Sequence, residues 1–408
     1  MNGQEIENII RTKASANPEN DEPFYIMEAN LILDQYLAWK RVFPKIRPFY
    51  AIKCNTDPVI LRMMRAFGCR FDCASSEEIS TVLALGADPI ADVIFANPCK
   101  FPSHIRAAKA AGVRRMTFDN EDELVKVAQL YPDAEMVLRI ATDDSHSMCA
   151  FSSKFGARMP NVPSILKRAA ELKVAIVGVS YHVGSGCADF SSYEKASNDA
   201  LKIFEMGREY GFEMHVLDVG GGFLATETPE ATLAEVGKFL NPVLEKFPAN
   251  TEFIAEPGRY FASRPFTVAI KIHSRRVIKD EAGNISQVLY YATEGVYHSF
   301  NCIFFDHQHP CPIVVPREGR DDTKMYSSTV FGPTCDSIDC ICKDHDMPLL
   351  EIGDWLYFKD MGAYTIAAVT KFNGFKGAAT IDYYWDKVLL KDIEGDLTSK
   401  VTEALKKC

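Results

Sequence analysis

Residues 48–74 read PFYAIKCNTDPVILRMMRAFGCRFDCA. The two ends of this stretch, PFYAIK and CRFDCA, are short apolar runs typical of buried strands, and the segment between them is apolar at helical spacing. The same alternation continues to about residue 262. The eight apolar runs are PFYAIK, CRFDCA, VIFANP, RMTFDN, EMVLRIA, AIVGVSYHV, HVLDVGG and EFIAEPG. This alternation predicts a (β/α)8 barrel, with a doubly wound open sheet as the alternative.

The pattern changes near residue 262, where turns and apolar runs replace the helical segments. The runs that we read as strands are FTVAIKIHSRRVI, QVLYYATEG, CIFF, PIVVP, SSTVFG, DWLYF, AAVTKFNGF and ATIDYYW. They predict a second, mostly β domain. We therefore expect a barrel over 24–262 and a β domain made of 1–23 plus 263–408.

The composition of the 408 residues, with 47% hydrophobic and 25% charged, is that of an ordinary globular chain. A net charge of -10 argues against a nucleic-acid partner, because the phosphate backbone demands a basic surface. No apolar run reaches membrane-spanning length, and the first twenty residues lack the pattern of a signal peptide. The 12 cysteines are scattered, so we expect reduced thiols and a cytoplasmic protein without a membrane partner.

Lys53 stands near the end of the first apolar run and needs an explanation. The strand can end there with the side chain reaching solvent, or the charge can be paired inside the fold. A third reading is that the amine serves covalent chemistry, because partial desolvation makes a lysine a usable Schiff-base nucleophile.

In a barrel of this kind, polar residues at the carboxyl ends of the strands form the site. Those that stand at such ends are Lys53, Asp72, Asn97, Arg139 and His182. The last two runs lead into Gly220-Gly221-Gly222-Phe223 and Gly258-Arg259-Tyr260. Glycines there let backbone N–H groups approach a phosphate, and Arg259 adds a charged donor, although a tight turn alone also requires glycine.

A phosphate seat, a lysine at a strand end and the carboxylate of Glu256 together match the requirements of a pyridoxal-phosphate site. In such a site the carboxylate keeps the pyridine nitrogen protonated. Glu256 can alternatively cap a turn or pair with Arg259. His182, which precedes a Gly-Ser-Gly turn, can stack on the cofactor or be an ordinary core histidine.

With these motifs the chain resembles the eukaryotic ornithine decarboxylases, in the alanine-racemase-fold group of pyridoxal-phosphate decarboxylases. The matching stretches are PFYAIKCN, FDCASSEEI, KFG at 154–156, YHVGSGC, LDVGGGF, EPGRYF, GVYHSFNCI, DHQHP, FGPTCDSID and MGAYT. They follow the family order from about residue 24 to 375. The resemblance implies decarboxylation of L-ornithine to putrescine and carbon dioxide, the first step of polyamine biosynthesis.

The resemblance also implies roles for individual residues. Lys53 would bond to the cofactor and Glu256 would face the pyridine nitrogen. The polar shell would consist of Asp72, Glu78, Arg139 and, stacked on the ring, His182. The phosphate would be held by Ser185, Gly222, Gly258, Arg259 and Tyr364. In the second domain, Cys335 would return a proton, and the distal amine of the substrate would meet Asp306, Asp336 and Tyr297.

In the family the active site lies between two protomers, so a head-to-tail homodimer is implied. Cys335 and Asp336 would then come from the partner, and Lys154 and Asp339 match the family's ion pair between subunits. A regulator similar to antizyme would bind helices near residues 101–130. Two departures are Phe305, where a tyrosine is usual, and Phe331, where a tryptophan is usual.

Several alternatives stay open. The acidic Asp306 and Asp336 favour a diamino acid, but lysine and arginine are also cationic, and diaminopimelate needs a basic partner that the stretch TCDSID lacks. A non-catalytic protein similar to the antizyme inhibitors shares the fold. The histidines and cysteines near residues 306–311 and 335–342 lack zinc-site spacing, so we expect no metal.

Overall fold

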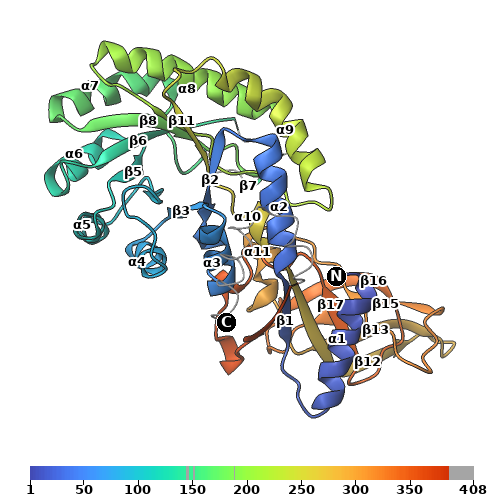
Figure 1. The fold of residues 1–408 in the computed structure, drawn as a ribbon. Helices are drawn as coiled ribbons and strands as arrows, with labels where there is room; N and C mark the ends of the chain where they lie inside the picture. The colour runs from blue at the N-terminus through green and yellow to red at the C-terminus, as the bar shows by residue number, and fades with distance from the viewer. Residues whose placement is uncertain (144–146, 150–151, 188, 386–408) are drawn as a thin grey trace. The chain divides into compact units, whose positions relative to one another are not determined.

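The computed structural model describes residues 1–143, 147–149, 152–187 and 189–385, and it divides into two compact units (Figure 1). The barrel unit consists of Leu33–Phe261. Among the described residues, the β unit combines Met1–Ile32 with residues 262–385. The part of the chain described contains no helix with the length and apolar character needed to cross a membrane.

Eight parallel strands close into a barrel, which confirms the predicted fold class and excludes the open sheet. In spatial order the strands are β10 (Val216–Asp218), β11 (Glu252–Ala255), β2 (Ile46–Ala51), β3 (Arg70–Cys73), β4 (Val93–Phe95), β5 (Arg115–Phe118), β6 (Glu135–Ile140) and β8 (Ala175–Tyr181). The ring is completed where β10 pairs with β8 and where β11 pairs with β2. A small antiparallel ladder joins β7 (Ser147–Cys149) to β9 (Ser185–Cys187).

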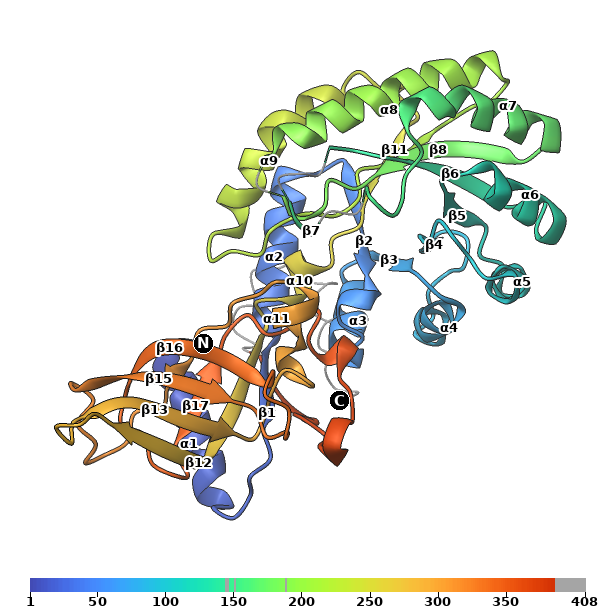
Figure 2. The same cartoon turned by 180° about the vertical axis from the view of Figure 1, so that it is seen from behind.

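Helices surround the barrel on its outer side (Figures 1 and 2). The α-helices are α2 (Ala29–Val42), α3 (Pro58–Ala66), α4 (Ser76–Ala84), α5 (Pro102–Ala111), α6 (Glu121–Leu130), α7 (Val162–Leu172), α8 (Ser191–Glu209), α9 (Pro229–Leu244) and α10 (Arg259–Ala262), and the 3-10 turns are η1 (Ile52–Cys54) and η2 (Met159–Asn161). Side-chain caps set several starts, since Asp57, Ser75 and Asn120 accept backbone N–H bonds from the first turns of α3, α4 and α6.

The barrel interior is apolar and closely packed. Its core cluster consists of Phe49, Ile94, Ala96, Val137, Val177, Val216 and Ile254. Gly178 in β8 lies opposite Val216 of β10, and a Cβ on that glycine would overlap the Val216 carbonyl oxygen. Close approach of β8 and β10 therefore depends on the absence of a side chain at position 178.

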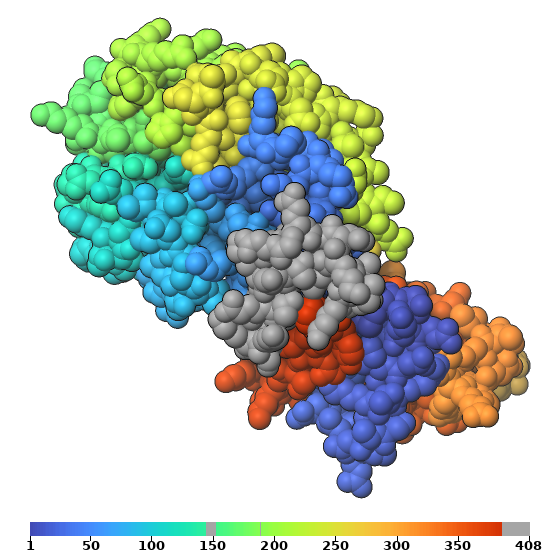
Figure 3. Space-filling view, viewed as in Figure 1, coloured from blue at the N-terminus to red at the C-terminus, as the bar shows by residue number. Residues whose placement is uncertain are grey.

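The β unit is built on a sheet of eight strands with the path β14-β17-β12-β13-β15-β16, and β1 joins it by pairing with β12 and β18. The strands are β1 (Phe24–Glu28), β12 (Phe266–Lys279), β13 (Ile285–Ala292), β14 (Ile313–Val314), β15 (Met325–Phe331), β16 (Cys340–Pro348), β17 (Trp355–Phe358) and β18 (Thr380–Tyr384). Helix α1 (Gly3–Ala16) packs Ile6 and Ile10 into a cluster with Trp355 and Tyr357, and in Figure 3 its dark blue surface adjoins other parts of this unit.

Several details of the β unit differ from the prediction. β1 falls inside the predicted barrel range, but its hydrogen bonds go to β12 and β18. CIFF is not a strand but the short helix α11 (Cys302–Phe305), which follows the 3-10 turn η3 (Ser299–Asn301). AAVTKFNGF is likewise not a strand and forms the turns η4 (Ile366–Ala368) and η5 (Phe372–Gly374). Apolar runs this short do not separate helix, turn and strand by periodicity.

Gly178→Ala should destabilise the protein, because the new methyl group has no space against β10. We expect the free energy of unfolding to fall by about 1–3 kcal/mol, the range for overpacked cores. Denaturant unfolding measures the change. Ser180→Ala is the matched control on the same strand. The Ser180 hydroxyl has no hydrogen-bond partner, so its removal should change the stability little. Equal stability of the two variants would contradict the overlap.

Candidate active site

Lys53 and Asp72 form an ion pair at the carboxyl edge of the barrel. Lys53 lies in η1 directly after β2, and its Nζ is 2.8 Å from Oδ2 of Asp72 in the neighbouring strand β3. The Lys53 side chain is 42% exposed, whereas the Asp72 side chain is fully buried. The structure thus shows a strand end and a paired charge rather than a buried amine. The ion pair with Asp72 holds the Lys53 amine in place, and the side chain stays accessible to solvent.

Glu256 and Asp218 form a buried carboxyl pair at the same edge. Glu256 follows β11, and its N–H donates to the Gly220 carbonyl at 2.7 Å. Burial and the Asp218 charge raise the pKa of Glu256 well above its ordinary value, and burial raises the pKa of Asp218 to about 6. Oε1 of Glu256 is buried and has no hydrogen-bond partner. Ionisation of both carboxyl groups together is therefore disfavoured in the barrel.

Asp218 was not among the predicted site residues. It is the last residue of β10, directly before Val219 and the three glycines. A fully buried aspartate at a barrel strand end is a sequence signal for a site residue, and this signal was present in LDVGGGF.

His182 follows β8 and carries no proton on Nδ1, because that atom accepts the Gly184 N–H at 3.1 Å. Burial and the charges of Arg139 and Lys53 lower the pKa of His182 well below its ordinary value. The imidazole is therefore neutral. The Arg139 guanidinium lies over the Phe155 ring at 5.4 Å from its centroid.

Glu78 lies near Lys53 and Asp72 on the first turn of α4. Its carboxylate accepts the Ala74 N–H at 2.5 Å. Burial raises the pKa of Glu78, with Asp72 adding to the effect and Lys53 opposing it. The predicted polar shell thus gathers around Lys53.

Most of the residues predicted to hold phosphate lie in the glycine loops and beside them. Arg259 Nη2 donates to Ser185 Oγ at 3.1 Å, which joins two residues predicted to hold phosphate. A Cβ on Gly222, whose φ is +102°, would lie 2.7 Å from the Gly184 carbonyl oxygen. A Cβ on Gly258 would lie 2.9 Å from Cys54 Cβ. Neither position leaves space for a side chain, as a close approach of the backbone to a ligand would require.

The other predicted residues lie in the β unit. Tyr297 donates its hydroxyl hydrogen bond to Asp336. That bond, with the Ile338 N–H, lowers the pKa of Asp336, and it raises the pKa of Tyr297 to about 12. The Cys335 thiol is exposed, and the Cys335 N–H donates to Asn373 Oδ1 at 3.1 Å.

Asp306 and Tyr364 have different surroundings. Asp306 is buried at the end of α11, where its N–H donates to the Cys302 carbonyl at 3.1 Å. Tyr364 is half-buried and has a left-handed backbone, with φ of 54°. Sequence reasoning missed Phe372, whose ring stacks on Tyr297 at 4.2 Å, and Asn373, because both lie in the run that we had read as a strand.

Asp339 accepts several hydrogen bonds from residues of its own chain. It is buried, and its carboxylate accepts bonds from the Val296 N–H at 2.8 Å, the Thr334 N–H at 3.0 Å and the Thr334 hydroxyl at 2.6 Å. Lys154 is exposed, with its ammonium 5.0 Å from the Phe155 ring centroid. The ion pair of Lys154 with Asp339 between subunits stays a prediction.

The remaining reactive groups are the cysteine thiols and the side chains that can bind a metal ion. The ten cysteines whose side chains are described carry thiols rather than disulfides. Within the described residues, no three or more His, Cys, Asp or Glu side chains are grouped as a metal site would require.

A lysine and a buried carboxyl pair at one edge of a closed barrel are the features expected of a pyridoxal-dependent enzyme of the barrel type. Residues 29–263 match the family described as pyridoxal-dependent decarboxylase, pyridoxal binding domain. The chain belongs to this family, which confirms the predicted resemblance and the pyridoxal cofactor.

Individual relatives agree with this assignment. Mouse ornithine decarboxylase is 44% identical over 372 residues, covering 88% of this chain and 80% of the mouse protein. Antizyme inhibitor 2 of Xenopus laevis is 42% identical over 367 residues, with the same coverage of 88% and 80%. The crystal structure of the Paramecium bursaria Chlorella virus arginine decarboxylase bound to agmatine has a TM-score of 0.86 at 32% identity, covering 93% of this chain and 100% of that one.

The barrel residues fit pyridoxal phosphate. The buried Oε1 of Glu256 lacks a partner and is an acceptor for a pyridine N–H. The positions closed to side chains at Gly222 and Gly258, with Ser185 and Arg259, suit a phosphate. Lys53 is the amine in the same charge cluster, since its charge acts on both Glu256 and His182.

The neutral His182 predicts a pH dependence of stability. Its pKa is lower in the folded barrel than in the unfolded chain, so the unfolded state binds more protons below about pH 6.5. We expect the urea midpoint of the cofactor-free protein to fall as the pH drops below that value, and His182→Phe to lessen the fall. His273→Phe, at an exposed histidine of the β unit, should leave it unchanged. Equal slopes for wild type and His182→Phe would refute the expectation.

Proposed function

We propose that this protein decarboxylates L-ornithine to putrescine and carbon dioxide with pyridoxal phosphate as cofactor. The observation that carries the proposal is the identity of 44% with mouse ornithine decarboxylase over 88% of the chain, in a sequence that retains every residue the chemistry needs. The residues retained are Lys53, Glu256, Arg259, Cys335 and Asp336.

In this proposal the barrel residues bind and tune the cofactor. Pyridoxal phosphate supplies an electron sink for the pair left when the carboxylate departs. Lys53 would hold the aldehyde, and Asp72 would orient the Lys53 amine. Glu256 would keep a proton at the pyridine nitrogen, and the neutral His182 would offer a flat ring face without adding positive charge. The phosphate would be held by Ser185, Gly222, Gly258, Arg259 and Tyr364.

Residues of the β unit bind the substrate and return the proton. The lowered pKa of Asp336 supports an ionised carboxylate for the distal ammonium of ornithine. Asp306 and Tyr297 would also contact this ammonium. The exposed Cys335 Sγ donates the proton that replaces the carboxylate. We further propose a homodimer in which Cys335 and Asp336 serve the partner's barrel, with Lys154 and Asp339 at the interface.

The wider setting follows from the same proposal. Putrescine formation makes the protein the entry to polyamine biosynthesis, and the thiols of the described cysteines suit the reducing cytoplasm. An antizyme-like regulator would bind the exposed faces of α5 and α6, in the range 101–130.

Substrate choice is tested by supplying ornithine, lysine, arginine and diaminopimelate separately and measuring carbon dioxide release. We expect ornithine to have the highest kcat/KM, exceeding lysine by roughly 10- to 200-fold, the effect of one methylene in a fitted pocket. Diaminopimelate should not react, because its distal carboxylate would meet Asp336. Faster turnover of lysine or arginine would replace the proposed substrate.

A non-catalytic role is the second candidate, because antizyme inhibitor 2 of Xenopus laevis matches the chain almost as well. The two candidates differ in cofactor chemistry. Wild-type protein supplied with pyridoxal phosphate and treated with borohydride should carry a covalent adduct on Lys53, identified by mass spectrometry. Lys53→Ala should lose this adduct and the visible cofactor absorbance. Lys45→Ala, at an exposed lysine paired with Glu245, is the control. A wild-type protein without adduct or carbon dioxide release supports the non-catalytic role.

A further inference from the structure

Glu294 and His298 form a fully buried ion pair in the β unit, between β13 and η3. Both side chains are 0% exposed, and His298 Nδ1 lies 3.3 Å from Glu294 Oε1. The other ring nitrogen, Nε2, lies 3.2 Å from the carbonyl oxygen of Phe375. Nε2 is hydrogen-bonded to this carbonyl, whereas Nδ1 makes no hydrogen bond and lies within ion-pair distance of the carboxylate. An N–H on Nε2 makes the Phe375 contact in either charge state, and protonation of the ring adds the attraction to Glu294.

The pair holds a distant segment of the chain at two points. His298 contacts the Phe375 carbonyl, and Glu294 Oε2 accepts the Ala378 N–H at 2.6 Å. Between these points Gly377 packs on the imidazole, where a Cβ would lie 2.8 Å from His298 Cβ. Glu294 Oε1 also accepts the Ser299 N–H at 3.1 Å, which fixes the carboxylate. Residues 375–378 are thus tied to the buried pair.

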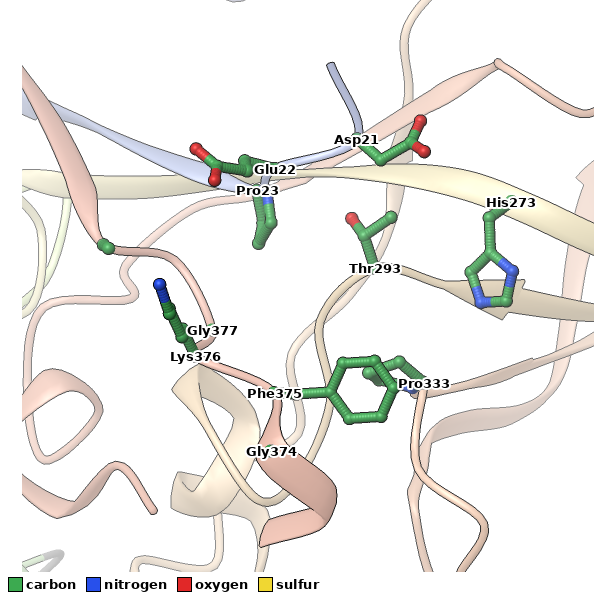
Figure 4. Close-up of a pocket in the computed structure, with 11 residues that line it drawn as sticks. Asp21, Glu22, Pro23, His273, Thr293, Pro333, Gly374, Phe375, Lys376 and Gly377 are labelled. Carbon is green, nitrogen blue, oxygen red and sulfur yellow. The ribbon is translucent and has the colours of Figure 1, made fainter. Parts of the chain in front are cut away.

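The tied segment leads directly to the proposed substrate residues. Asn373 Oδ1 accepts the Cys335 N–H at 3.1 Å, and the Phe372 ring stacks on Tyr297, which donates to Asp336. The same segment lines a cavity of about 560 Å³. In Figure 4 the Phe375 ring lies beside Pro333, two residues before Cys335.

We propose that the Glu294–His298 pair is a positioning device for the reaction, which fixes residues 372–378 and through them the placement of Cys335 and Asp336. The inference rests on the proposed function for the roles of Cys335 and Asp336. Neither member of the pair touches substrate in this proposal. Their effect is transmitted by Asn373 and by the stacked pair of Tyr297 and Phe372.

The charged groups around His298 are consistent with a protonated ring. Burial lowers the pKa of His298, but the Glu294 carboxylate, the Phe375 carbonyl and the Asp339 charge outweigh it, so the pKa lies above its ordinary value. Tyr25, whose pKa is raised by burial and by Glu294, stays neutral. Because the pKa of His298 is raised, the Glu294–His298 ion pair is intact at low pH. It is lost as the pH rises through the pKa of His298 in the folded protein.

The test uses holoenzyme of the wild type, His298→Ala, His298→Gln and Glu294→Gln, with His273→Ala as the matched control. His273 lines the same cavity from β12 but is exposed and outside the pair. Hydrogen exchange followed by mass spectrometry should show faster exchange in peptides covering residues 372–378 and Cys335 in the His298 variants. His298→Gln fills the site without a charge, so it serves if the alanine variant does not fold.

Kinetics provide the second readout. We expect kcat/KM for ornithine to fall roughly tenfold to hundredfold in the His298 variants, since a misplacement of about 1 Å costs that much. The alkaline limb of the wild-type pH profile should move to lower pH in Glu294→Gln, because a neutral partner holds the proton less firmly. A purely structural role would not move this limb.

The outcomes separate the inference from the proposed function. Exchange needs no substrate, so it tests the connection to residues 372–378 even if the wild type does not release carbon dioxide from ornithine. Unchanged exchange in these peptides overturns the inference. So does lowered activity with an alkaline limb that stays in place in Glu294→Gln.

Discussion

The pairing of β11 with β2 is the constraint on which the site depends. Parallel strands place their carboxyl ends at one edge, and closure brings the last strand of the barrel beside the first. Glu256 and Lys53, about two hundred residues apart in sequence, thereby enter one charge cluster. Without closure the carboxyl pair and the amine would stand at opposite margins of an open sheet. The close approach of β8 and β10 at Gly178 completes the same ring.

Charge balance at this edge is set by burial as much as by distance. Asp72, Asp218 and Glu256 bring three carboxyl groups together with Lys53 and Arg139 as the nearby cations. Three ionised carboxylates would outnumber these two cations, and burial together with the Asp218 charge raises the pKa of Glu256. His182 adds no further cation, because its Nδ1 accepts a backbone N–H and burial lowers its pKa.

The sequence contains enough information to predict the strands of the barrel and the residues at their ends, because both follow from local periodicity. Lys53, Asp72, Arg139 and His182 stand where the alternation placed them. Residues whose role depends on distant pairing were not found. Asn373 matters because its side chain meets the Cys335 N–H, and no local pattern signals such a contact. The strand predicted for the run AAVTKFNGF was wrong for the same reason, since its backbone is held by distant contacts with His298 and Tyr297.

The buried pair of Glu256 and Asp218 has a consequence for assembly of the holoenzyme. Burial raises the pKa of both carboxyl groups, and the Asp218 charge adds to the shift at Glu256. In the proposed function a protonated pyridine nitrogen lies beside Glu256, and its positive charge would offset the repulsion between the two carboxylates. Cofactor loading would therefore favour an ionised pair that the barrel alone disfavours.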